Sequence, residues 1–167
     1  MKSVGIFVDL SNQFHCTKKK FRRKLDYKKY FAKASKDYTV SRAVAYGSQI
    51  ADEAKTFISC LKYIGFQTKY RQPLIIETEE TTRFRIDWDV GIAMDVVRCI
   101  EKLNVVILGS SDPDLIPLVE YIQEKGCECI IFSTGINKKL KDVANKWIEI
   151  TEDLLEDEKN VITNDAK

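Results

Sequence analysis

The sequence predicts an α/β protein: a three-layer αβα sandwich with a central, mostly parallel sheet of about five to six strands. Short apolar runs rich in β-branched residues, such as Val4–Val8 and Val105–Leu108, are typical of buried parallel strands. Segments with apolar residues at helical spacing separate these runs. Strands that alternate with helices indicate βαβ units with right-handed crossovers. A chain of 167 residues can bury one substantial core.

The first half of the chain is predicted to contain three strands, over Val4–Val8, Val40–Tyr46 and Phe66–Arg71. A polar, basic loop is expected after the first strand, followed by a helix over about residues 26–36. A second helix, over about residues 52–64, separates the next two strands. Its apolar residues recur at helical spacing, and Gly65 lies where a glycine commonly caps a helix.

The second half is predicted to add three strands, over Val105–Leu108, Glu128–Phe132 and Trp147–Ile150. Residues 73–86 are irregular and fit either a hairpin or a loop. A helix that begins at Asp87 or Asp89 follows them. Pro113 fits the first turn of another helix, and a short helix is expected over about residues 138–144.

The composition is ordinary for a soluble globular protein, with 44% hydrophobic and 31% charged residues. No apolar run approaches the ~18 residues needed to cross a membrane, and no signal peptide is recognisable. Five cysteines without CxxC spacing and a single histidine do not fit the usual zinc sites, so reduced structural thiols are expected. We therefore expect a cytoplasmic protein without a membrane partner. Residues 1–155 should form a single domain, and residues 156–167 a disordered tail.

Charge is distributed unevenly, although the net charge is only +2. Residues 149–158 carry acids and no basic side chain, whereas residues 18–36 are strongly basic. Such a basic segment can attract a nucleic-acid backbone, but it is also typical of a solvated helix face. The candidate substrate-binding side chains of the segment are Lys18, Lys19, Lys20, Arg22 and Arg23.

Acidic residues follow predicted strands or begin predicted helices at three separate points. Asp9 ends the first strand, Asp89 stands at the start of a helix, and Asp112 and Asp114 follow the strand Val105–Leu108. Each acid taken singly is explained as a helix cap or turn residue. However, the carboxyl ends of parallel strands meet at one sheet edge, where ligands bind. We therefore expect the carboxylates to converge there and to hold a hard cation such as Mg²⁺.

Three polar residues are expected to assist the acids, and one further acid is expected to lie apart. Asn12 could direct its amide at a phosphate or a water, while Ser110 and Ser111 could offer hydroxyl and N–H groups to an anion. Asp95 comes six positions after Asp89, about 240° further around a helix with ~100° per residue. Asp95 should therefore not share a metal with Asp89. It should instead contact residues that hold the metal ligands, or pair with a basic neighbour.

At these residues the chain resembles the NYN branch of the PIN-like nucleases, specifically its LabA-like group. That family begins with a strand and a D-x-x-N element, matched by Asp9 and Asn12. Its central helix, written roughly K-x-x-D-V-x-L-A-x-D, is matched by WDVGIAMD with Asp89 and Asp95. Its third element, S-G-D-S-D-F-x-P-L, is matched by SSDPDLIPL. The order and spacing of the three elements agree over about residues 3–150.

The resemblance implies a PIN-like fold and Mg²⁺- or Mn²⁺-dependent hydrolysis of RNA. Ser111 stands where the family usually has glycine, Pro113 replaces a small residue, and Arg85 is the nearest basic residue before the central motif. Arg85 is therefore a further candidate contact to substrate. Carried over by position, the metal ligands would be Asp9, Asp89, Asp112 and Asp114, and these acids with Asn12 would form the catalytic set. Asn12 and Ser110 would position phosphate or a metal-bound water.

Three functional hypotheses remain. The first is a metal-dependent endoribonuclease acting on RNA, expected to be single-stranded. The second is a non-catalytic RNA-binding or regulatory module of the same fold. The third is a phosphatase or nucleotide hydrolase. This last class is disfavoured because Ser11 stands where a D-x-D pair would need its second aspartate, and because no GxxxxGK[ST] loop is present. A homodimer is left open.

Overall fold

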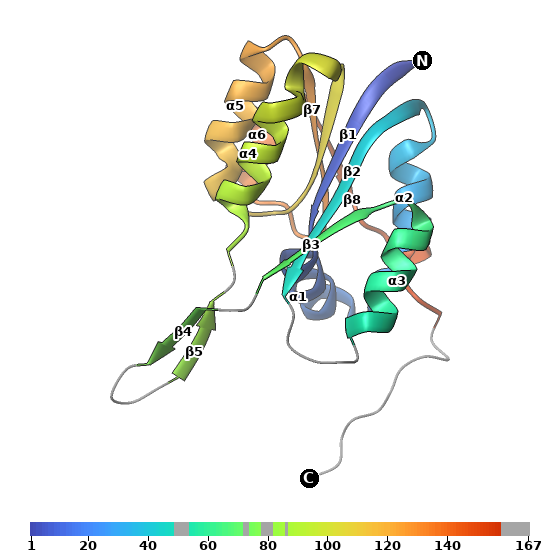
Figure 1. The fold of residues 1–167 in the computed structure, drawn as a ribbon, viewed down its shortest axis with the longest axis vertical. Coiled ribbons are helices and arrows are strands. Elements are labelled where there is room, and N and C mark those ends of the chain that lie inside the picture. The colour runs from blue at the N-terminus through green and yellow to red at the C-terminus, as the bar shows by residue number, and fades with distance from the viewer. Residues whose placement is uncertain (49–53, 72–73, 78–81, 86, 158–167) are drawn as a thin grey trace.

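A computed structural model of the chain describes residues 1–48, 54–71, 74–77, 82–85 and 87–157. Its main sheet has six parallel strands in the order β3-β2-β1-β6-β7-β8 (Figure 1). This confirms the predicted sandwich with a largely parallel sheet. The strands are β1 (Lys2–Asp9), β2 (Tyr38–Ser48), β3 (Gln67–Arg71), β6 (Val105–Gly109), β7 (Glu128–Ser133) and β8 (Lys146–Glu149).

Helices cover both faces of the sheet. One apolar cluster joins Val4, Ile6 and Val8 of β1 to the helices α1 to α3, and a second joins Phe7 to the helices α4 to α6. The alternation along β1 thus supplies both halves of the core, as expected of a strand buried on two faces. The helices are α1 (Leu10–Phe21), α2 (Tyr27–Ser35), α3 (Ala54–Ile64), α4 (Asp89–Cys99), α5 (Ile116–Glu124) and α6 (Lys138–Val143).

The irregular segment, for which the sequence allowed a hairpin or a loop, contains two short strands. Residues 74–77 (β4) and 82–85 (β5) pair as an antiparallel hairpin, so this segment is not a loop. The hairpin extends away from the main sheet (Figure 1). Single-turn 3₁₀ helices are η1 (Ile100–Lys102), η2 (Pro113–Leu115) and η3 (Glu152–Leu154).

The main departure from expectation is α1, because a basic loop was predicted after the first strand. Its inward side chains, Leu10, Gln13 and Thr17, are mostly polar and are buried at helical spacing. Gln13 Nε2 donates to the carbonyl of Phe132 at 3.0 Å, and the hydroxyls of Thr17 and Thr134 lie 3.2 Å apart. The helix therefore crosses the carboxyl ends of the sheet and is held there by hydrogen bonds, which apolar periodicity cannot predict.

The strand order places a topological switch point at the carboxyl ends of β1 and β6. The chain moves outward from β1 through β2 to β3, and then returns to form β6 on the other side of β1. Ligands in open α/β sheets bind at such a switch point, outside the carboxyl ends of the strands. The segments that follow β1 and β6 begin at Leu10 and Ser110, and the acids lie beside these points.

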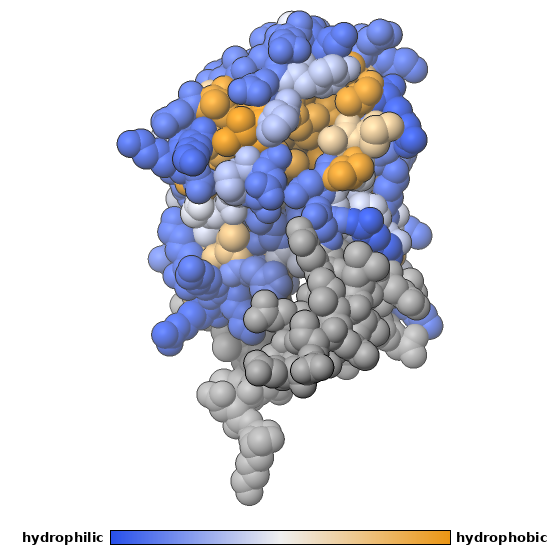
Figure 2. Space-filling model, turned by 90° about the vertical axis from the view of Figure 1, so that its left-hand side faces the viewer, coloured by the Kyte–Doolittle hydropathy of each residue, from blue (hydrophilic) through white to orange (hydrophobic). Residues whose placement is uncertain are grey.

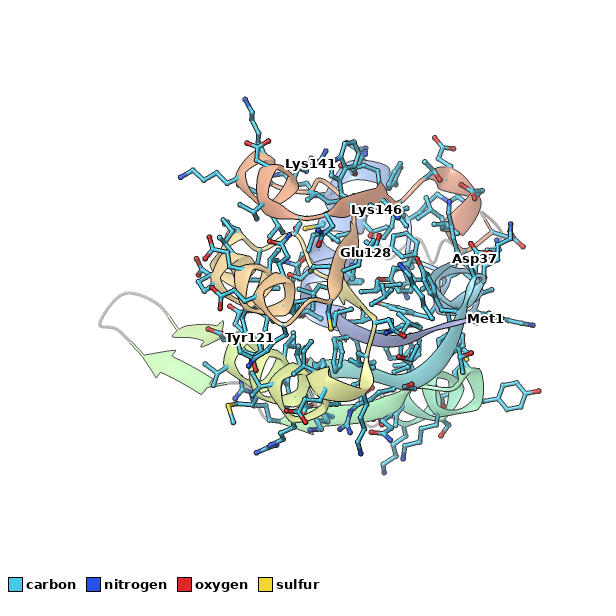
Figure 3. The ribbon with its side chains drawn as sticks, turned by 90° about the horizontal axis from the view of Figure 1, so that it is seen from above. Met1, Asp37, Tyr121, Glu128, Lys141 and Lys146 are labelled. Carbon is cyan, nitrogen blue, oxygen red and sulfur yellow. The ribbon has the colours of Figure 1, made fainter. Side chains whose placement is uncertain are left out.

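The amino edge of the sheet carries ion pairs, and the outer face of one helical layer carries exposed apolar side chains. At the amino edge Glu128 accepts Lys146 Nζ at 2.6 Å and Lys2 Nζ at 3.4 Å, and Figure 3 shows Glu128 beside Lys146. Apolar side chains gather on the outer face of the α4–α5 side (Figure 2), where Val90 and Met94 are exposed. No helix in the described part of the chain is long and apolar enough to span a bilayer.

The remaining expectations concern thiols and the tail. None of the five cysteines forms a disulfide, and Cys127 and Cys129 are buried, as predicted for structural thiols. Cys60 is exposed, so the prediction that all five thiols are structural is wrong for this residue. The expected disordered tail, residues 156–167, falls largely outside the described residues, which end at Asp157. Within them, the Glu156 N–H donates to the carbonyl of Lys24 at 2.9 Å.

Candidate functional site

Asp9 connects the first strand to the first helix. It is the N-cap of α1, and its Oδ1 accepts the N–H of Asn12 at 3.0 Å. Burial raises the pKa of this carboxyl, the N–H groups of Asn12 and Ser11 lower it, and the charge of Asp112 raises it further. The net effect is a raised pKa, so ionised Asp9 lies in an environment that favours a compensating positive charge.

Asn12 fixes the loop that follows β6. Its Oδ1 accepts the N–H of Ser111 at 3.0 Å and the hydroxyl of Ser111 at 3.1 Å. Ser110 is buried, and its Oγ accepts the N–H of Asp112 at 3.2 Å. These polar side chains therefore hold the acidic loop against α1. Their direct contact with a phosphate or water stays a prediction.

Asp112 and Asp114 stand on one short turn. Asp112 is the N-cap of η2, and its Oδ1 accepts the N–H of Asp114 at 3.0 Å. Pro113 is the first residue of η2, and Leu115 anchors the turn in the core. The capping role predicted for Asp112 is confirmed. Asp114 is exposed and Asp112 half-buried, so both carboxylates face the accessible edge.

Asp89 is the first residue of α4. Asp87 Oδ1 accepts the N–H of Asp89 at 2.9 Å. Between them, Trp88 Nε1 donates to the carbonyl of Gly47 at 2.9 Å, and the Arg71 guanidinium lies 4.3 Å from the indole ring centre. These contacts attach the start of α4 to the ends of β2 and β3, which sets the direction of Asp89.

The structure brings three of the four predicted metal ligands together. One carboxylate oxygen from each of Asp89, Asp112 and Asp114 lies within 4.8 Å of the others. Asp9 is not in this group of three, but its charge contributes to the raised pKa of Asp89. Burial raises that pKa to about 7, helped by the charges of Asp87, Asp112 and Asp9. Carboxylates that repel each other in this way are suited to a hard divalent cation.

Asp95 lies apart from this cluster, as its position on the helix predicts. It is 2% exposed and accepts the Tyr46 hydroxyl at 2.7 Å and Lys69 Nζ at 2.6 Å. Burial alone would raise its pKa, but the hydrogen bonds from Lys69 and Tyr46 outweigh burial and lower it. The expectation that Asp95 pairs with a basic neighbour is thus correct.

The basic side chains of α1 lie on a helix that runs along the same sheet edge as the acids. Lys18 and Lys19 are exposed, while Lys20 Nζ lies 3.6 Å from Glu149. Arg22 is exposed just beyond the helix, and Arg23 donates to the carbonyl of Glu156. The Arg85 side chain lies outside the described residues, so its predicted role is untested.

Two residues that the sequence reasoning did not assign to the site belong to it. Asp87 was considered only as a possible start of the helix, yet its charge helps to raise the pKa of Asp89. Trp88 fixes the start of α4 through Gly47 and Arg71. The available signal was their position in RIDWD, where two acids flank a large aromatic residue at a helix start.

Comparisons with known proteins identify the family and support the fold. The model of the NYN domain family matches residues 3–152. A solved structure of a protein of unknown function from Vibrio parahaemolyticus has a TM-score of 0.83 and 26% sequence identity, covering 93% of this chain and 96% of that one.

Two further comparisons add little. Escherichia coli phosphofructokinase-2, solved with potassium, has a TM-score of 0.40 and 15% identity, covering 71% of this chain and 43% of that one, which is too weak for inference. No curated protein matches significantly. On the strength of the match over residues 3–152, the chain belongs to the NYN domain family, within the PIN-like nuclease superfamily.

Proposed function

We propose that this protein is a metal-dependent endoribonuclease of the LabA-like type, which hydrolyses RNA phosphodiester bonds at its acidic cluster. One observation carries the proposal: oxygens of Asp89, Asp112 and Asp114 lie within 4.8 Å of one another at the switch point of the sheet. These acids come from two elements that are distant in sequence. Each could cap its own helix without meeting the others, so local capping alone does not explain their convergence.

The donor set fits Mg²⁺ or Mn²⁺. Carboxylate oxygens are the ligands that these hard cations prefer, and Asp89, Asp112 and Asp114 would hold the ion, with Asp9 beside them. When bound, such an ion lowers the pKa of a water and stabilises charge on phosphoryl oxygens. The raised pKa of Asp89 means that this carboxyl must lose a proton to act as a ligand.

The chain's own residues would position the substrate. Asn12 and Ser111 hold the acidic turn in one place, so the ligand oxygens are preorganised. Lys18 and Lys19 extend the site along α1 as exposed charges that attract a phosphate backbone. An exposed edge of this kind suits single-stranded RNA. Its phosphates can lie along the edge, and the protein does not need to enter the groove of a duplex.

The test is cleavage of end-labelled single-stranded RNA by wild type and by Asp112→Asn in Mg²⁺ or Mn²⁺. The asparagine keeps the oxygen that caps Asp114 but removes the negative charge. We expect cleavage to fall at least a hundredfold, whereas Asp142→Asn, on the exposed face of α6, should behave as wild type. Equal cleavage by wild type and Asp112→Asn would refute the assignment. Double-stranded RNA and single-stranded DNA, run in parallel, define the substrate class.

The exposed lysines also favour a second candidate, a non-catalytic RNA-binding module, because Lys18 and Lys19 do not depend on the acids. This candidate predicts salt-sensitive RNA binding in EDTA, no metal-dependent cleavage, and binding that survives Asp9→Asn. Fluorescence anisotropy with a labelled oligonucleotide separates the two candidates. Binding that is lost in Asp9→Asn would count against the second.

A further inference from the structure

A hollow with aromatic walls opens at the same sheet edge as the acidic cluster, on the face covered by α1 to α3. Its volume is about 340 Å³, within the usual range of small-molecule sites. We call it the aromatic pocket, because its walls are mostly rings and apolar side chains. The principal lining residues are Leu10, Phe14, Tyr27, Phe57 and Tyr70.

One residue of the pocket wall, Tyr70, carries a polar group that is shielded from solvent and lacks a partner among the described residues. The Tyr70 hydroxyl is buried and has no hydrogen-bond partner among the described residues. A buried hydroxyl without a partner is costly, so such groups commonly mark a place where a ligand or water completes the bonding. Gly47 allows this arrangement, because a Cβ at that position would lie 2.7 Å from the Tyr70 ring. The backbone thus leaves space for the ring at the pocket wall.

The aromatic pocket and the acidic cluster are built on shared segments of the chain. Ser11 lines it and stands in the chain between Asp9 and Asn12. Gly47 also lines it, and the Gly47 carbonyl accepts the Nε1–H of Trp88, the residue before Asp89. Two residues of the pocket wall therefore belong to segments that also position the acids.

The edges and faces of the rings suit a planar aromatic ligand. Tyr27 and Phe57 pack edge to face with ring centres 5.6 Å apart, and Phe14 and Phe57 are 39% and 42% exposed. Lys24, which also lines the pocket, is exposed and could neutralise a phosphate at the mouth. The wall also carries the hydroxyls of Ser11 and Ser48 and the acid Glu156. Rings that can stack, hydroxyls that can bond a polar edge and one cation together match a nucleobase attached to its phosphate.

We propose that the aromatic pocket takes up one unstacked nucleobase of the RNA strand whose backbone lies at the acidic cluster. This inference rests on the proposed function and names the part of the substrate that the enzyme holds. The base stacks on the rings around Phe57, and its polar edge bonds the Tyr70 hydroxyl. Recognition of a base beside the cleaved bond would give the enzyme a preference at one nucleotide position.

The first experiment uses the full-length Asp112→Asn protein and a labelled single-stranded RNA with one abasic nucleotide moved stepwise along it. Anisotropy should show about tenfold weaker binding when the abasic nucleotide occupies one particular position. Phe57→Ala should weaken binding of intact RNA by about tenfold and should remove this positional effect. Tyr63→Ala is the matched control, because Tyr63 lies on the same helix and is 91% exposed.

Tyr70→Phe separates a binding role from a structural one. The substitution keeps the ring and removes only the unpartnered hydroxyl, so the protein should keep or gain stability while RNA binding weakens a few-fold. Unchanged RNA binding by both Tyr70→Phe and Phe57→Ala, together with no position sensitive to an abasic nucleotide, would overturn the proposal. Continued RNA cleavage by wild type in that case would leave the proposed function standing.

A second measurement tests the pocket without RNA cleavage. In NMR titrations of the wild-type protein, adenosine or uridine monophosphate should shift resonances of the pocket residues, whereas ribose 5-phosphate should not. Such a result supports the pocket even if no RNA is cut. Equal shifts with ribose 5-phosphate, or no shifts with any of the three probes, would contradict base recognition. The latter outcome would assign the apolar slot to another kind of partner, such as a protein side chain.

Discussion

Replacing Asp89 by asparagine should stabilise the metal-free protein at alkaline pH while removing activity. The pKa of Asp89 is raised from its ordinary value of 3.8 to about 7, first by burial and then by the neighbouring acids. Protonated Asp89 therefore stabilises the folded protein fully at a pH below about 4, the pKa of this group in the unfolded chain. The stabilisation is lost as the pH rises through about 7, its pKa in the folded protein. Asparagine cannot ionise, so the variant avoids this loss.

The magnitude follows from the same pKa. A difference of about three pH units corresponds to about 4 kcal/mol at 1.36 kcal/mol per unit. Since Asp89 is only half-buried, solvent screening reduces the expected gain to about 1–2 kcal/mol at pH 8.5. At pH 4 the gain should vanish. Saturating Mg²⁺ should reverse the order, because an ion at 100 times its Kd adds about 2.7 kcal/mol to the wild type.

The assay is urea denaturation followed by circular dichroism, in EDTA and in Mg²⁺, between pH 4 and pH 8.5. Asp142→Asn serves as the control for removing an exposed carboxylate. The reasoning is refuted if Asp89→Asn is less stable than wild type at pH 8.5 in EDTA. It is also refuted if the difference between the two proteins is the same at every pH.

Three further variants test the surroundings of the site. Lys69→Met should lower the free energy of unfolding by about 3 kcal/mol at pH 7, because it leaves the buried Asp95 charge poorly paired. The pKa of Asp95 is lowered, so ionised Asp95 stabilises the folded protein above the pKa that it has in the unfolded chain, and this stabilisation disappears in acid. The stability difference between Lys69→Met and wild type, measured by urea denaturation, should therefore shrink near pH 3. Asn12→Ala should cost about 1–3 kcal/mol in thermal unfolding and slow RNA cleavage, because the acidic turn loses its anchor; full stability would exclude that anchoring role. Lys18→Ala with Lys19→Ala should reduce the slope of log binding constant against log salt by about 0.7 per lost phosphate contact, and an unchanged anisotropy slope would place RNA elsewhere.

The fold was largely predictable because its central strands are apolar on both faces. β1 and β6 are each recognisable from a few consecutive residues, and their parallel pairing follows from the helices between them. α1 was missed because Gln13 and Thr17 fill its buried side, so the helix has no apolar stripe. Its position depends on hydrogen bonds to residues more than a hundred positions away, such as Phe132.

The site was predictable in kind but not in detail. Sheet topology alone indicates that acids after parallel strands share an edge, and Asp89, Asp112 and Asp114 do converge. Sequence spacing cannot show that Asp9 is not one of this group of three, because membership depends on the direction of α1 and α4. Sequence spacing also cannot distinguish an aspartate that only caps a helix from one whose charge acts on a neighbouring metal ligand. The electrostatic role of Asp87 was missed for this reason.

The capping bonds of the acids have an evolutionary consequence. Asp9, Asp87 and Asp112 each use one carboxylate oxygen to accept a backbone N–H two or three residues further along the chain. Asparagine offers the same oxygen, and an aspartate codon becomes an asparagine codon by one transition. A lineage can therefore lose the charge at these positions while the local turns persist. Members of such a family can therefore keep the fold while losing the acidic cluster through single-nucleotide changes.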